Sequence, residues 1–212
     1  MPGQIPKIVY GYRILHYKNL PFILQNGIYC PSSDTKDANY INIGKKDIIN
    51  KRENKLVIVQ PYGRIHDYVS FYFGPKSPML YSIYKGNSDT TCLQADVVYI
   101  VTSIPLIVEK KLSFIFTTGQ AIMQLSTQHN NPEELSKIDW DVINAKYWFD
   151  KPPEFVDRAR KRMAELLIYE YLPVNCILEI GVKNKEMLQI VEKMVSALCL
   201  DVKVKELPNW YY

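Results

Sequence analysis

The sequence predicts an α+β domain. Its expected strands and helices do not alternate regularly along the chain, which argues against a doubly wound parallel sheet. The 212 residues are 47% hydrophobic and 23% charged, as in an ordinary globular protein, and they suffice for one well-packed core. No internal repeat, low-complexity tract or Gly/Ser linker separates two compositions, so we expect residues 1–212 to form a single domain.

Residue types that are typical of helix ends predict the first strand and helix of the chain. Residues 8–15 form the first expected strand, and Asn19 can cap a short helix over residues 20–25. Pro21 in the first turn and Gly27 after the last residue are typical of helix ends. A strand followed directly by a short helix is therefore expected at the N-terminus.

A polar segment follows this helix. Residues 31–44 form a predicted loop, and a loop of this length in a compact domain is often functional. The charged residues 47–54 form a predicted helix. Four later segments are short, rich in aromatic and β-branched residues, and bounded by glycine or proline. These expected strands cover residues 68–73, 80–85, 97–103 and 113–117.

The second half of the chain carries three expected helices and two expected strands. Residues 132–145 have Glu133 and Glu134 in the first turn, where carboxylates favour a helix. A second helix opens at Pro153 and runs to about residue 163. The remaining elements are strands over residues 176–182 and 202–205 and an amphipathic helix over residues 185–198.

Charge, cysteines and hydropathy limit the function classes. The net charge of +4 permits nucleic-acid binding without demanding it. The four cysteines lie far apart and form no CxxC pair, so neither a zinc site nor a redox motif is indicated. No apolar run approaches the roughly 20 residues of a membrane helix, and the N-terminus lacks a signal-peptide pattern. We therefore expect a cytoplasmic protein with reduced thiols, no metal and no membrane contact.

Aromatic residues are frequent. The chain has 16 tyrosines, and aromatic residues make up 12% of it. Aromatic rings fill cores, but they also present flat faces to bases and nicotinamide rings. Tyr72, Tyr81 and Tyr147 are candidates for stacking on bases, and core packing is the alternative for each.

Three features carry possible chemistry. His16 ends the first expected strand, and residues 66–81 form a block rich in aromatic and polar residues. Glu165 lies between a basic turn and a wholly apolar run, where an unpaired carboxylate is costly to bury. A salt bridge to a neighbouring arginine is the simpler explanation. No Walker loop, GxGxxG, HExxH or spaced Ser-His-Asp set is present, which weakens the kinase, dehydrogenase and hydrolase readings.

Together these residues resemble the DarT family, the DNA ADP-ribosyltransferase toxins of bacterial toxin–antitoxin systems, and in particular its thymidine-modifying branch. The resemblance runs over nearly the whole chain, and its most specific part is the block of residues 66–81. Its landmarks are His16, Asn19, Gly27, Arg52, residues 66–69, 71–73 and 77–81, Trp148, Glu165 and residues 210–212.

The resemblance implies an ADP-ribosyltransferase fold, in which two small packed sheets and surrounding helices form a cleft for NAD. Residues 35–51 match the element that closes over NAD, and residues 119–165 match the loop that presents the acceptor base. Relatives often carry histidine at position 13 and a smaller residue at position 22. The implied catalytic residues are Glu165 and Arg52, and the implied NAD-binding residues are Arg13, Ile14, Leu15, His16, Phe22, Cys30 and Arg52.

The implied reaction transfers ADP-ribose from NAD to a thymidine base in single-stranded DNA and releases nicotinamide. Thymine N3 is paired in a duplex, which makes a single strand the natural substrate. The implied partners are single-stranded DNA and a macrodomain antitoxin that reverses the modification. We expect Arg52 and Glu165 on opposite sides of one cleft, where Glu165 holds the ribose and Arg52 binds phosphates or the deprotonated base.

Alternatives stay open at this point. The acceptor could be guanosine in DNA, or RNA or a protein, since only the acceptor loop would differ. A non-catalytic nucleic-acid-binding module would tolerate loss of Glu165. Arg52 could also pair merely with Asp47, Glu53 or another surface acid.

Overall fold

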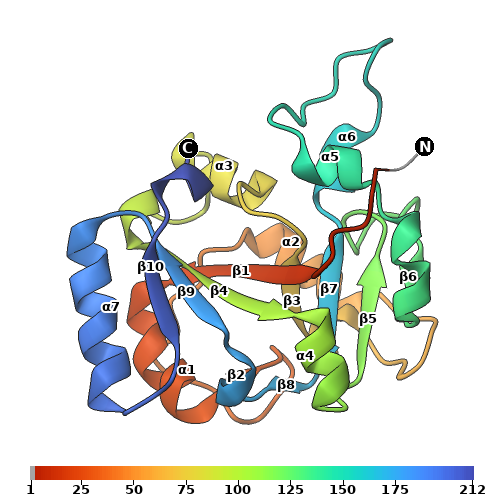
Figure 1. Cartoon of the computed structure of the whole chain (residues 1–212). Helices are drawn as coiled ribbons and strands as arrows, with labels where there is room; N and C mark the ends of the chain where they lie inside the picture. Colours follow the sequence, from red (N-terminus) through yellow and green to blue (C-terminus); the bar gives the residue numbers. More distant parts are fainter. Residues whose placement is uncertain (1–2) are drawn as a thin grey trace.

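The computed structural model describes residues 3–212 and contains one eight-stranded sheet and one two-stranded sheet (Figure 1). The large sheet has the order β10-β9-β4-β1-β3-β7-β5-β6, and β2 pairs with β8 in the small one. The strands are β1 (Tyr10–His16), β2 (Ile28–Tyr29), β3 (Tyr68–Tyr72), β4 (Val97–Ser103), β5 (Phe114–Thr117), β6 (Gln128–His129), β7 (Glu165–Tyr169), β8 (Tyr171–Leu172), β9 (Glu179–Val182) and β10 (Lys203–Glu206). The α-helices are α1 (Leu20–Asn26), α2 (Lys46–Asn54), α3 (Pro78–Tyr84), α4 (Ile104–Glu109), α5 (Trp140–Asn144), α6 (Arg158–Arg162) and α7 (Lys185–Ala197).

The large sheet consists of two halves that meet at one residue pair. Strand β1 runs antiparallel to β4 along its whole length, but it pairs with β3 only through Tyr12 and Tyr72. Strand β3 then pairs antiparallel with β7 over all five residues, and β7 pairs with β5. The two small sheets expected from the family resemblance are thus the two halves of one continuous sheet.

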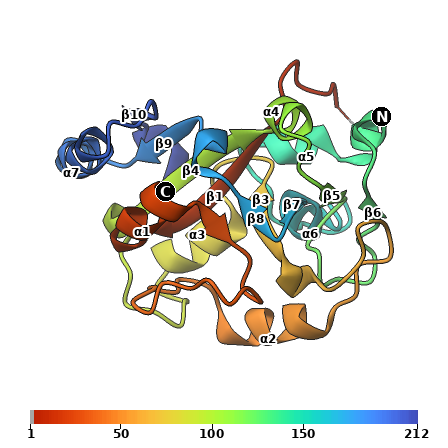
Figure 2. The same ribbon diagram turned by 90° about the horizontal axis from the view of Figure 1, so that it is seen from below.

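Helices cover both sides of this sheet. Figures 1 and 2 show α4 on one side and α2 on the other, while α7 lies along the β9–β10 edge. The largest hydrophobic cluster includes the fully buried Leu15, Ile100, Leu166 and Ile180, which come from four strands. These strands therefore form the rigid framework on which the loops near β7 and α2 are carried.

The C-terminal tripeptide is part of this framework. The Tyr211 hydroxyl donates to the Val97 carbonyl at 2.9 Å, and the Trp210 ring meets the Tyr99 ring edge-on at 5.3 Å. The Tyr212 hydroxyl donates to the Lys76 carbonyl at 2.7 Å. The chain end thus holds β4 and the segment before α3 together.

Most predicted elements are confirmed. The structure has strands at β1, β3, β4, β5, β9 and β10, and helices at α1, α2 and α7, close to their expected places. The residues 31–44 form no helix or strand, as predicted. The irregular order of strands and helices confirms the α+β class.

Residues 80–85 were predicted as a strand, and that prediction is wrong. Residues 80–84 belong to α3 and Lys85 follows its last residue, because the Ser77 hydroxyl accepts from the Leu80 N–H at 3.2 Å and Pro78 occupies the first turn. This cap outweighs the strand preference of the aromatic residues that follow.

Two predicted helices are shorter than expected. Residues 132–145 split into a 3-10 helix (Pro132–Lys137) and α5, because the Asp139 side chain starts a new helix by accepting from the Val142 N–H. The helix expected from Pro153 begins only after Asp157, whose φ of 64° is left-handed. The strand expected over residues 176–182 is also shorter. It is β9, which begins at Glu179, so residues 176–178 lie before it.

Two sizeable elements were not predicted. Helix α4 begins where the Ser103 hydroxyl caps the Leu106 N–H and Pro105 lies in the first turn. Strand β7 begins at Glu165 and continues through the apolar run after it, and its first four residues are buried between β3 and β5. Within residues 3–212, no helix is both long and apolar enough to span a membrane.

Candidate active site

A cavity of about 580 Å³ lies beside β1 and β3 and is also lined by residues of α2. A volume of this size is typical of small-molecule sites in enzymes. Its walls come from β1, α1, residues 27–49, β3 and α3. The polar lining residues include Arg13, Tyr40, Asn42, Lys45, Arg52, His66, Ser70, Tyr72, Ser82 and Gln120.

Glu165, at the first position of β7, is not itself a lining residue, but it contacts the lining residue Arg52. The Glu165 side chain is 3% exposed, and it faces Tyr72 across the β3–β7 pairing. Oε2 accepts from Arg52 Nη1 at 2.8 Å, and Oε1 accepts from the Ala121 N–H at 2.9 Å. Both carboxylate oxygens are therefore held, and the orientation of the group is set by two other segments of the chain.

Arg52 comes from the last turn of α2, a helix that contributes no buried residue of its own. Its guanidinium lines the cavity, and Nη2 is buried with no hydrogen-bond partner in the described part of the chain. Arg52 and Glu165 are thus in direct contact, where we expected them on opposite sides of a cleft. The pairing with Asp47 or Glu53 is not formed, and the salt bridge suggested for Glu165 reaches an arginine distant in sequence.

Arg13 is a second guanidinium in the cavity wall. Nη1 donates to the Ser70 carbonyl at 2.9 Å and to the Ser70 hydroxyl at 3.3 Å. Nε is buried and has no partner within residues 3–212. Two buried donor atoms, one on Arg13 and one on Arg52, therefore lack an acceptor within residues 3–212.

The other expected NAD-binding residues divide into two groups. Ile14, Phe22 and Cys30 line the cavity. Leu15 does not, because β-strand alternation turns it into the core on the other face of β1.

His16 also lies away from the cavity wall. Its Nδ1 accepts from the Lys18 N–H at 3.2 Å, and its ring stacks on Tyr17. Burial lowers the pKa of His16, so the neutral form that caps this turn is favoured. Its place in the structure is that of a capping residue at the end of β1.

Several cavity residues were missed in the sequence. Ser70 and Gln120 line the cavity, and so does Met163, two residues before Glu165. The β-strand period gives a partial signal, since Ser70 and Tyr72 alternate with the buried Val69 and Phe71 on β3. For Gln120 no pattern in the sequence indicates the site.

The three tyrosines proposed for base stacking differ in environment. Tyr72 lines the cavity, and burial raises the pKa of its hydroxyl. Tyr81 packs against the rings of Trp148, Phe149 and Tyr212, so core packing applies there. Tyr147 is 70% exposed, whereas Tyr72 and Tyr81 are partly buried.

Comparison with known proteins now identifies the family. The family model described as "ssDNA thymidine ADP-ribosyltransferase, DarT" matches residues 12–212. A DNA ADP-ribosyl transferase of Escherichia coli O127:H6 is 30% identical over 202 residues, covering 95% of this chain and 92% of the relative. One from Thermus aquaticus is 32% identical over 219 residues, covering 100% of this chain and 94% of the relative.

Solved structures agree with the sequence relatives. Thermus sp. 2.9 DarT in complex with ADP-ribosylated ssDNA superposes with a TM-score of 0.93 at 30% identity, and each chain is fully covered. The same protein in complex with NAD+ gives a TM-score of 0.86 at 29% identity, with 99% of this chain and 100% of the other covered. The chain therefore belongs to the DarT family of single-stranded-DNA thymidine ADP-ribosyltransferases, enzymes that take ADP-ribose from NAD.

Proposed function

We propose that residues 1–212 act as one DarT-like domain that binds NAD in the cavity and transfers its ADP-ribose at Glu165. The observation that carries this proposal is the contact of the cavity residue Arg52 with the buried Glu165 carboxylate. The Arg13 Nε and Arg52 Nη2 atoms then donate to the pyrophosphate oxygens of NAD. Arginine suits this task because its planar donors match phosphate oxygens. Ile14, Phe22 and Cys30 provide apolar contacts to the nucleotide.

The reaction breaks the bond between nicotinamide and ribose C1′ and forms a bond between C1′ and thymine N3. Nicotinamide leaves with the bonding electrons, so the ribose develops oxocarbenium character. A fixed, buried carboxylate stabilises this charge without having to reorganise. Glu165 accepts a hydrogen bond from the ribose 2′-hydroxyl, and the proton released from N3 passes to its carboxylate. Arg52 stays protonated and stabilises negative charge on the phosphates and on the thymine ring.

The acceptor strand lies against the segments that flank Glu165. Residues 145–157 form a long loop between α5 and α6 that projects from the molecule (Figure 1), and Tyr147, Phe149 and Phe155 on it are exposed. The Lys146 amine lies over the Tyr147 ring at 5.5 Å, and the Arg158 guanidinium lies over the Phe155 ring at 4.5 Å. Aromatic faces next to cations favour the binding of unpaired bases and of the phosphates that join them.

A partner that removes the modification fits the chemistry, because thymine substituted at N3 can no longer pair with adenine. A relative from Thermosipho africanus, 24% identical over 197 residues, is a DNA ADP-ribosyl transferase–DNA ADP-ribosyl glycohydrolase fusion protein, and this chain spans 47% of its length. We therefore propose that this chain is a toxin whose partner is a macrodomain glycohydrolase antitoxin. Since NAD and DNA meet in the bacterial cytoplasm, we place its action there.

The test uses labelled NAD with four separate acceptors, which are single-stranded DNA, the matching duplex, the matching RNA and a protein mixture. We expect label only on single-stranded DNA, and mass spectrometry should locate ADP-ribose on thymine. Label on guanine or on RNA would move the activity to one of the alternative acceptors. If no acceptor is labelled and nicotinamide is not released, the chain is a binding module without this activity.

A further inference from the structure

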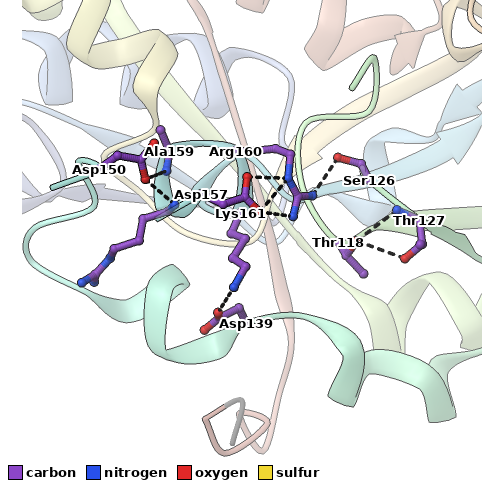
Figure 3. A network of polar contacts seen from close by, with 10 residues as sticks. Thr118, Ser126, Thr127, Asp139, Asp150, Asp157, Ala159, Arg160 and Lys161 are labelled. Carbon is purple, nitrogen blue, oxygen red and sulfur yellow. Dashed lines mark hydrogen bonds and ion pairs between the residues drawn. The ribbon is translucent and has the colours of Figure 1, made fainter. Parts of the chain in front are cut away.

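Arg160 joins two segments that enclose Glu165. It lies in α6, which leads directly into β7, and it contacts the 118–127 loop between β5 and β6 (Figure 3). Nε and Nη2 donate to the Asp157 carboxylate at 2.8 and 2.6 Å, and Nη1 donates to the Ser126 hydroxyl at 3.1 Å. Its side chain is 12% exposed. The guanidinium thus connects α6 to this loop through hydrogen bonds.

The same loop holds the carboxylate of Glu165. The Gln120 N–H donates to the Arg160 carbonyl at 3.1 Å, and the next amide, Ala121 N–H, donates to Glu165 Oε1 at 2.9 Å. Thr117 Oγ1 accepts from the Glu165 N–H at 3.1 Å and donates to the Gly119 carbonyl at 2.6 Å. The loop therefore reaches Arg160 and Glu165 through successive backbone amides.

Gly119 shows how closely Arg160 approaches the loop. A Cβ atom at position 119 would lie 2.3 Å from Arg160 Nη1 and 3.0 Å from the Arg160 carbonyl oxygen. Only a residue without a side chain leaves room for the guanidinium there. The loop path and the arginine are consequently fitted to each other.

We propose that Arg160, clamped by Asp157, is a positioning residue for the transfer reaction. It holds the 118–127 loop so that the Ala121 N–H orients the Glu165 carboxylate. This inference rests on the proposed function of Glu165. Arg160 itself lies outside the cavity lining, so it sets the geometry of the reaction and leaves the binding of NAD unchanged.

The effect of losing Arg160 should appear in turnover. A misplacement of about 1 Å in a reacting group can cost about 100-fold in rate. We expect Arg160→Gln to lower kcat by about 10-fold or more and to change KM for NAD by less than about 3-fold. Arg160→Lys should recover only part of kcat, because one ammonium cannot bind both Asp157 and Ser126.

Lys161→Met is the matched control. Lys161 lies in the same helix and pairs at 2.9 Å with Asp139, the residue before α5, and the hydrogen bonds of its side chain do not reach the 118–127 loop (Figure 3). The Lys161→Met substitution removes one positive charge from α6, as Arg160→Gln does. Its kcat should stay within about 2-fold of wild type.

Ser126→Ala keeps the proposal testable if Arg160→Gln folds poorly. It removes only the contact between the guanidinium and the loop, and we expect a loss of about 3-fold or more in kcat. The double variant should lose no more than Arg160→Gln alone, since both act through one contact. Wild-type kcat in a folded Arg160→Gln, a loss confined to KM for NAD, or losses that multiply in the double variant would each overturn the proposal. An inactive wild type would refute the proposed function instead.

Discussion

The Glu165 carboxylate is held at 2.8 Å by the guanidinium of Arg52, although 113 positions separate the two residues in sequence. The pair joins α2, a helix without buried residues, to the fully enclosed strand β7. Burying such a carboxylate costs free energy because the charge loses its hydration, and the ion pair with the arginine offsets this cost. The contact thus links a residue of the cavity wall to a buried carboxylate behind it.

The Arg52–Glu165 pair predicts that substitutions of the two residues have non-additive effects on the free energy of unfolding. Arg52→Met should lower the free energy of unfolding by about 3 kcal/mol, because it leaves the buried carboxylate without its partner. Arg52→Met combined with Glu165→Gln should recover most of that loss. Urea denaturation of wild type, Arg52→Met, Glu165→Gln and the double variant measures this coupling. Equal losses that simply add would show that the two side chains do not interact in solution.

Arg162 predicts a second stability effect. Its buried guanidinium donates to the carbonyls of Val142, Ile143 and Pro75, and burial lowers its pKa. Arg162→Met should destabilise the protein by about 2–4 kcal/mol, because these carbonyls lose their donor.

Arg158→Met in the same helix is the comparison for Arg162. The Arg158 side chain lies over the Phe155 ring and makes no ion pair within residues 3–212. Its loss should cost under about 1 kcal/mol. Thermal unfolding of both variants decides the matter, and similar melting temperatures would contradict the role given to Arg162.

The clamp between Asp157 and Arg160 predicts a pH dependence. Hydrogen bonds from Arg160 hold the pKa of Asp157 below its ordinary value of 3.8. A carboxylate with a lowered folded-state pKa contributes stability above its unfolded pKa and loses it as the pH falls through the folded pKa. The stability difference between wild type and Arg160→Gln should therefore be full at pH 6 and shrink below pH 3.8. A difference that stays constant from pH 6 to pH 3 would show that the charge on Asp157 is not involved.

Tyr147 predicts a separable effect on the DNA acceptor. Stacking of a base on an aromatic ring contributes about 1–3 kcal/mol, so Tyr147→Ser should raise KM for single-stranded DNA about 5-fold or more. KM for NAD should not change, since Tyr147 does not line the cavity. Val108→Ser is the control, because Val108 is 49% exposed on α4, on the other side of the sheet from α2. Steady-state kinetics with each substrate varied in turn measures both constants.

The sequence predicted the elements whose signals are local. Pro21 and Gly27 mark α1, and the apolar period marks α7. Asn19 occupies the N-cap position of α1 but does not cap it as predicted, because its side chain bonds to the Ile41 backbone. Strand β7 was missed because a strand buried on both faces reads as a continuous apolar run without a period of two. Helix α3 was missed because a Ser-Pro cap outweighed the propensity of aromatic residues.

The site was predictable only in part. Glu165 is marked by its isolated charge, and the family resemblance pointed to Arg52 and Arg13. Their hydrogen-bond partners were not predictable, since the Ser70 carbonyl and the Ala121 amide are backbone groups and carry no sequence signal. The same holds for the contact of Arg160 with Ser126, which depends on the path of a loop around Gly119.

The role of Glu165 in the transfer step is tested most directly by the single-turnover rate of thymidine modification in Glu165→Gln. Glutamine keeps the shape of the side chain and can still accept from the Ala121 N–H, so the fold should persist and NAD should still bind. With saturating NAD and a single-stranded thymidine oligonucleotide, we predict a rate at least about 100-fold below wild type, because the negative charge that stabilises the oxocarbenium-like ribose is lost. A folded, NAD-binding Glu165→Gln protein that modifies thymidine at a rate near that of wild type would contradict this role.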